Sequence, residues 1–107
     1  MKSYGVEYTS EASENITDLF EYVLDQSQNY TTATRYIDRL YEKCEAIGNA
    51  PFGGVARDDL SVGTRLAIFE KKVLILYSLL EDVIVITNVF HGAQDYLSLL
   101  RHGKSES

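Results

Sequence analysis

Two long apolar runs near the carboxyl end constrain the fold of this chain more than any other feature. They cover residues 73–80 and 83–90, and only Glu81 and Asp82 separate them. β-Branched residues dominate the second run, which favours a strand over a helix. A third run lies before them at 64–69, and a short turn at 70–72 joins it to the run at 73–80. Because such short connections join antiparallel neighbours, the pattern predicts a three-stranded meander.

These runs are apolar at nearly every position rather than at every second one. Strands with that pattern are covered on both faces, or they keep one apolar face for a partner. The sequence leaves both interpretations open.

The beginning of the chain shows two other periodicities. Residues 4–8 alternate between apolar and other positions, which predicts a short strand. Thr9 or Ser10 then suits the N-cap of a helix. From residue 12 to residue 24 the apolar side chains recur at the spacing of an amphipathic helix.

A second helical stripe runs from residue 33 to residue 47. We expect Thr31 or Thr32 to cap this helix, and Gly48 to end it at the C′ position. Since the link between the two helices is short, they should form an antiparallel hairpin. Cys44 lies within the stripe and is interpreted as a small buried apolar residue.

The predicted fold class is α+β. An N-terminal strand is followed by an antiparallel helical hairpin, which packs on an antiparallel sheet made of the meander and the first strand. Apolar residues at 96–100 predict a short C-terminal helix. We expect one domain over residues 1–101 and a mobile polar tail at 102–107.

The charge and composition of the chain limit the classes of function that it can have. The chain has 107 residues and a net charge of −6, and its first 30 residues carry six acids against one lysine. Because nucleic-acid binding relies on neutralising phosphates, this balance argues against strong direct nucleic-acid binding. No apolar run is long enough for a membrane helix, and no signal peptide is visible. With a single cysteine, the chain is expected in the cytoplasm.

The loop between the helical and the strand-rich halves holds the candidate functional residues. Arg57 and Arg65 flank Asp58 and Asp59. The arginines could form ion pairs that hold the loop, or they could contact an anion, because a guanidinium suits phosphate. His91 ends the last strand and is either structural or functional. No spacing of side chains predicts a metal or cofactor site.

The chain resembles the RelE/ParE superfamily of toxins from type II toxin–antitoxin systems. The resemblance spans residues 4–100 and follows the order of elements together with short motifs. The motifs are Tyr4–Ala12, Ala50-Pro51, Arg57-Asp58-Asp59-Leu60, Gly63-Thr64-Arg65, Val73–Tyr77 and Val89–Asp95.

The resemblance implies one of two activities. RelE-like members are ribosome-dependent endoribonucleases that cut mRNA, and they use cationic side chains instead of a metal. ParE-like members poison DNA gyrase and block replication. Both kinds bind a cognate antitoxin that holds them inactive.

The ParE-like branch is favoured here. The helices are long, as in that branch, the acidic charge does not suit binding to the ribosome, and no lysine pair matches the general-base region of RelE-like members. Gln94 departs from both branches, which usually have an arginine there. We therefore expect no catalytic residues and a gyrase inhibitor that acts by protein–protein contact. The residues implied for target or antitoxin contact are Arg57, Arg65, His91, Gln94, Asp95 and Tyr96.

Two alternatives remain. In a RelE-like nuclease, Arg65, His91 and Arg57 would act on the scissile phosphate. Alternatively, a weakly toxic member would act mainly as an antitoxin-bound corepressor, which the departure at Gln94 suggests.

Overall fold

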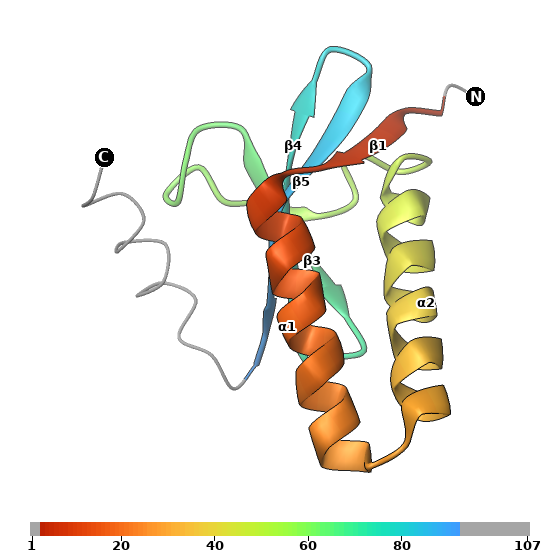
Figure 1. Cartoon of the computed structure of the whole chain (residues 1–107). Helices are drawn as coiled ribbons and strands as arrows, with labels where there is room; N and C mark the ends of the chain where they lie inside the picture. The colour runs from red at the N-terminus through yellow and green to blue at the C-terminus, as the bar shows by residue number, and fades with distance from the viewer. Residues whose placement is uncertain (1–2, 93–107) are drawn as a thin grey trace.

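Two helices cover one face of a five-stranded sheet (Figure 1). The computed structural model describes residues 3–92. The helices are α1 (Ser10–Ser27) and α2 (Tyr30–Ile47), which lie side by side and antiparallel. The strands are β1 (Gly5–Tyr8), β2 (Val55–Ala56), β3 (Thr64–Phe69), β4 (Val73–Leu80) and β5 (Val83–His91). The predicted α+β class, first strand, helical hairpin and meander are confirmed.

The prediction of an antiparallel sheet is wrong, because the sheet is mixed. Its order is β1-β5-β4-β3-β2, and β1 pairs with β5 in parallel. The helical hairpin carries the chain from β1 at one edge of the sheet to β2 at the other, so β1 meets β5 only after the meander has returned across the sheet. The sequence analysis also missed β2, whose two residues pair with Leu66 and Arg65 of β3.

The helix ends confirm one expected cap and correct two. Thr9 caps α1, and its hydroxyl accepts from the amide of Ala12 at 3.0 Å. Asn29, not Thr31 or Thr32, caps α2, because the left-handed backbone of Gln28 reverses the chain within two residues. Gly48 is not a left-handed C′ residue, since its φ is −60°. A side chain there would instead collide with the backbone carbonyl of Tyr4.

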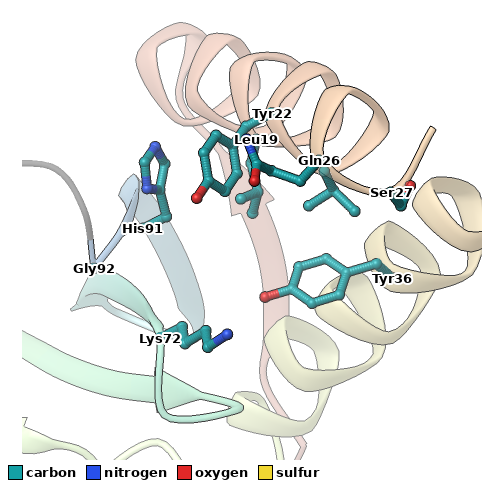
Figure 2. Close-up of a pocket in the computed structure, with 9 residues that line it drawn as sticks. Leu19, Tyr22, Gln26, Ser27, Tyr36, Lys72, His91 and Gly92 are labelled. Atoms are coloured by element: carbon teal, nitrogen blue, oxygen red, sulfur yellow. The ribbon is translucent and has the colours of Figure 1, made fainter.

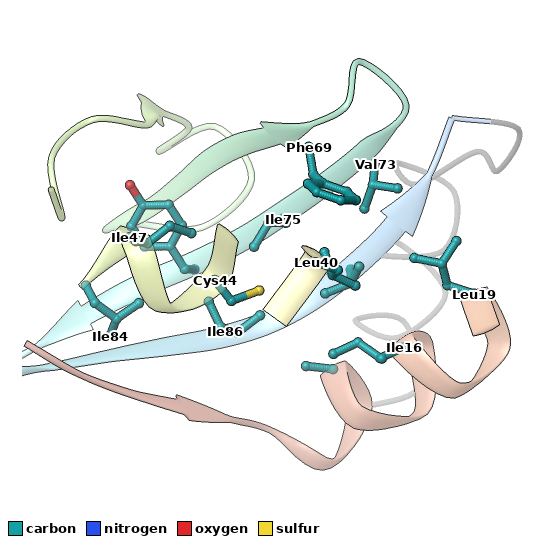
Figure 3. Close-up of a cluster of buried hydrophobic side chains, with 13 residues drawn as sticks. Ile16, Leu19, Leu40, Cys44, Ile47, Phe69, Val73, Ile75, Ile84 and Ile86 are labelled. Carbon is teal, nitrogen blue, oxygen red and sulfur yellow. The ribbon is translucent and has the colours of Figure 1, made fainter. Parts of the chain in front are cut away.

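The core lies between the helices and the sheet (Figure 3). Apolar side chains of both helices pack against the strands here. They include Ile16 and Leu19 of α1, Leu40 and Cys44 of α2, and Ile75 and Ile86 of the strands. Cys44 is fully buried, and desolvation raises the pKa of its thiol to about 11. The thiol is therefore protonated at neutral pH, which confirms its interpretation as an apolar core residue.

A bulge in β5 decides which residues face the helices. Leu76 pairs with Asn88 but Tyr77 pairs with Ile86, so Thr87 is an extra residue in β5. Ile86 faces the core before the bulge and Val89 faces it after the bulge. Because the alternation shifts by one residue, His91 is placed on the helix side of the sheet. The Thr87 carbonyl also accepts from the Thr9 hydroxyl, which ties the bulge to the start of α1.

The second face of the sheet is only partly covered. Leu76 and Phe90 are buried, whereas Ile68 and Leu80 are more than half exposed. Part of this apolar face is therefore covered and another part is exposed. The predicted C-terminal helix and the polar tail lie outside the described residues.

Candidate functional site

Arg65 holds the loop that connects α2 to β2. Its Nη2 atom donates to the carbonyl oxygens of Phe52 at 2.9 Å and Gly54 at 2.6 Å. The guanidinium also lies over the Phe52 ring, 5.5 Å from its centroid. Its buried Nε has no hydrogen-bond partner among the described residues. Two of the contacts that the guanidinium makes thus go to the chain's own backbone, which is the loop-holding role that the adjacent aspartates suggested.

Tyr77 fastens the same loop from β4. Its side chain is fully buried, and its hydroxyl donates to the Pro51 carbonyl at 2.8 Å and accepts from the Gly54 amide at 3.1 Å. A Cβ atom at Gly54 would lie 2.6 Å from that hydroxyl and 2.7 Å from the Leu66 carbonyl. Only glycine therefore fits at this close approach.

Arg57 and the two aspartates order the next part of the loop. The Arg57 guanidinium donates two hydrogen bonds to the Asp59 carboxylate, both at 2.9 Å. These bonds hold the pKa of Asp59 below its usual value. Asp58 accepts from the Gly63 amide at 2.8 Å, which closes the loop before β3. We refer to the set of Arg57, Asp59, Arg65 and Tyr77 with the loop at 51–54 as the clasp.

His91 lies at the opposite corner of the sheet and belongs to a pocket. Its ring stacks on that of Tyr22 from α1, with centroids 4.4 Å apart and planes inclined by 12°. Figure 2 shows this pair on one side of the pocket and Tyr36 of α2 on another. The pocket has a volume of about 630 Å³. Its lining residues are Leu19, Tyr22, Val23, Gln26, Ser27, Tyr36, Lys72, His91 and Gly92.

Two features of its walls determine the character of this pocket. Desolvation raises the pKa of the Tyr36 phenol, which therefore keeps its proton at neutral pH. Among the described residues that line the pocket, Lys72 is the only lysine or arginine, and none is an aspartate or glutamate. The β3–β4 turn that carries Lys72 has left-handed backbone at Glu70 and Lys71.

The sequence analysis missed this pocket except for His91. Tyr22, Tyr36 and Lys72 lie on three separate elements, and no spacing in the chain relates them. The one signal that could have pointed to it is that His91 ends a strand beside a glycine.

The structure brings Arg57 and Arg65 together but keeps His91 apart from them. Arg65 of β3 pairs with Tyr77 in the middle of β4, whereas His91 of β5 pairs with Val73, the first residue of β4, across its other edge. Four residues of strand separate those positions by about 13 Å along the strand. Gln94, Asp95 and Tyr96 lie outside the described residues. Among residues 3–92, no helix is long and apolar enough to span a membrane, and no cluster of side chains suits a metal ion.

The comparisons with known proteins agree with this architecture. Residues 6–96 match the family model described as the ParE toxin of the type II toxin–antitoxin system parDE. The chain belongs to the ParE toxin family. No sequence among the curated proteins compared matches it.

Two solved structures show the same fold. One is described as the chromosomal ParDE system from P. aeruginosa, with 12% identity, a TM-score of 0.71, and coverage of 83% of this chain and 96% of that one. The other is the toxin–antitoxin complex RelBE2 from Mycobacterium tuberculosis, with 19% identity, a TM-score of 0.60, and coverage of 83% and 98%. At these identities, the likeness supports the fold of this ParE-family chain.

Proposed function

We propose that this ParE-family chain is a toxin that inhibits DNA gyrase by protein–protein contact and so blocks replication. Membership of the ParE family over residues 6–96 is the observation that carries the proposal. The net charge of −6 supports it, because an acidic protein suits a protein target better than exposed RNA or DNA. Its site of action is the cytoplasm.

The separation of the cationic side chains supports a binding role over a nuclease role. Cutting a phosphodiester without a metal needs several positioned groups around one phosphate. Arg65 donates to two backbone carbonyls, Arg57 pairs with Asp59, and His91 lies at the far corner of the sheet. These three residues would have to leave their present positions to share one phosphate.

A cognate antitoxin is the second proposed partner. The two similar structures are described as ParDE and RelBE2 toxin–antitoxin systems. Partner peptides of this kind bind as an added strand or as a helix in an apolar groove. We assign Arg57, Arg65, His91, Gln94, Asp95 and Tyr96 to contact with the target or the antitoxin, and the two arginines contribute by holding the loop in shape.

Induced expression with two parallel measurements tests the function. We expect a DNA-damage reporter to respond and growth to stop, while primer extension shows intact transcripts. Co-expression of the small protein encoded next to this gene should restore growth. Cleaved transcripts without DNA damage would instead identify a RelE-like nuclease, and continued growth would favour the corepressor.

A further inference from the structure

The pocket beside His91 has the properties of a small-molecule site. Its volume of about 630 Å³ lies within the range of pockets that hold ligands, about 300–1,000 Å³. Leu19 is buried at its base and Val23 is half-buried, so part of the lining is apolar. Such a pocket favours a ligand with an apolar body.

Aromatic rings form two of its sides. The Tyr22 ring is fixed by stacking on His91, and the Tyr36 ring packs edge-on against Phe69 with centroids 5.4 Å apart. Arg39 lies over the Tyr36 ring and pairs with Glu70 at 2.8 Å. Because both rings have packing partners behind them, the walls are organised before a ligand arrives. Rings of this kind favour a planar aromatic body.

Hydrogen-bond donors remain available around the opening. No hydrogen bond from the hydroxyl of Tyr22 or Tyr36 joins it to another of the described residues, unlike that of Tyr77. In Figure 2 the Tyr36 hydroxyl and the Lys72 ammonium both point into the space between the elements. Lys72 forms no ion pair within residues 3–92, whereas the neighbouring Glu70 is paired with Arg39.

The described lining of the pocket is basic, whereas the protein as a whole is acidic. The chain carries a net charge of −6, yet the lining residues that the structure describes include a lysine and no carboxylate. The turn that carries Lys72 places Glu70 and Lys71 in left-handed backbone, with φ of 49° and 65°. Both are the central residues of the hairpin turn that the Lys72 amide closes onto the Phe69 carbonyl, and such turns require positive φ at both positions, so the turn fixes the backbone next to Lys72.

We propose that this pocket binds a small aromatic carboxylate, with the ring between Tyr22 and Tyr36 and the carboxylate at Lys72. The site lies at the other corner of the sheet from the clasp, and it shares His91 with the residues assigned to contact with the target or the antitoxin. Tyr36 and Tyr22 donate hydrogen bonds to the ligand, and Leu19 and Val23 contact its ring.

Three probes separate the contribution of the ring from that of the charge. Phenylacetate has both, phenylacetamide keeps the ring without the charge, and acetate keeps the charge without the ring. Two-dimensional NMR of the full chain should show phenylacetate binding with a Kd of about 1 mM, as expected for a ligand of this size. The shifted amides should be those of the pocket, Tyr22, Val23 and Lys72 among them. Phenylacetamide should bind about fivefold more weakly, and acetate should shift none of these amides.

Two lysine variants complete the test. Lys72→Gln should weaken phenylacetate about fivefold and leave phenylacetamide unchanged. Lys71→Gln is the matched control, because it removes the same charge one residue away and outside the lining, and it should change neither affinity by more than about twofold. Equal effects of the two variants, equal binding of acid and amide, or shifts outside the pocket would overturn the proposal.

Discussion

The clasp and the His91 pocket occupy opposite ends of the same sheet, and they use similar side chains in opposite ways. In the clasp, Arg65 and Tyr77 direct their polar atoms at backbone groups of residues 51–54. In the pocket, Lys72 and Tyr36 direct theirs into open space (Figure 2). The cationic and phenolic groups therefore hold the fold at one end and are available to a ligand at the other.

The difference shows that residue type does not reveal the role of a cation. Arginine is the usual choice for phosphate, but its planar fork suits backbone carbonyls equally well. Arg65 has such carbonyls within reach because β2 brings the loop alongside β3. Within residues 3–92 Lys72 forms no ion pair, and its turn follows the end of β3 that is farther from Arg65. We expect substitutions at the two ends to separate stability from binding.

Arg65→Met should have the largest effect on stability. It keeps most of the side-chain volume but removes the donor to the Phe52 and Gly54 carbonyls, and charged hydrogen bonds of this kind contribute about 1.5–3 kcal/mol. Urea unfolding measures the loss. Lys72→Met is the control at the other end and should change the free energy of unfolding by less than about 0.5 kcal/mol. A similar loss in both variants would remove the distinction.

Gly54→Ala should destabilise the protein by about 2 kcal/mol. The new methyl group would collide with the Tyr77 hydroxyl and the Leu66 carbonyl, and overpacking of this kind costs about 1–3 kcal/mol. Thermal denaturation measures the effect. Gly5→Ala, where the added atom meets nothing within 4 Å, should leave the melting temperature unchanged or raise it. If both variants have the same melting temperature, the loop at 51–54 does not pack closely against Tyr77 and Leu66.

Two tyrosine-to-phenylalanine variants remove the same single oxygen atom, one from the clasp and one from the pocket. Tyr77→Phe removes a buried hydroxyl that makes two hydrogen bonds, and it should cost about 1–2 kcal/mol. Tyr22→Phe removes a hydroxyl from the pocket and should cost less than about 0.5 kcal/mol. Chemical denaturation of both proteins under one condition provides the measurement. A larger loss for Tyr22→Phe would reverse the comparison.

The smallest expected effect is the pH dependence of stability that comes from the Arg57–Asp59 ion pair in the clasp. Since the hydrogen bonds from Arg57 lower the pKa of Asp59 below the ordinary value of an aspartate, 3.8, the folded state favours the ionised carboxylate. This contribution is complete above the unfolded value, and it is lost as the pH falls through the lower, folded value. NMR titration should therefore place the Asp59 midpoint below 3.8, and Arg57→Gln should raise it. A midpoint at or above the ordinary value would mean that the pair does not form in solution.

Local patterns predicted most of the elements, because each one is encoded by neighbouring residues. The bounds of β3 and β4 follow from apolar runs that turns interrupt, and the Thr9 cap follows from a side chain next to its helix. The parallel pairing of β1, the short β2 and the bulge at Thr87 depend on contacts between distant parts of the chain. No local pattern predicts them.

The same limit applies to the candidate site. The aspartates beside Arg57 indicated an ion pair, which Arg57 forms with Asp59, whereas Arg65 holds the loop through backbone carbonyls that no charge in the sequence indicated. The pocket depends on three elements and on the bulge that turns His91 toward α1, so His91 alone was a candidate. Binding residues that are drawn together only by folding cannot be found from spacing.

The proposed action of this ParE-family chain is to bind gyrase rather than to cut RNA. The most direct measurement is a supercoiling assay with purified gyrase, relaxed plasmid and increasing amounts of the purified chain. The account predicts a dose-dependent loss of supercoiling with cleaved plasmid trapped on gyrase, while mRNA on ribosomes stays intact at the same concentrations. Unchanged supercoiling at large molar excess, together with cleaved mRNA, would contradict it.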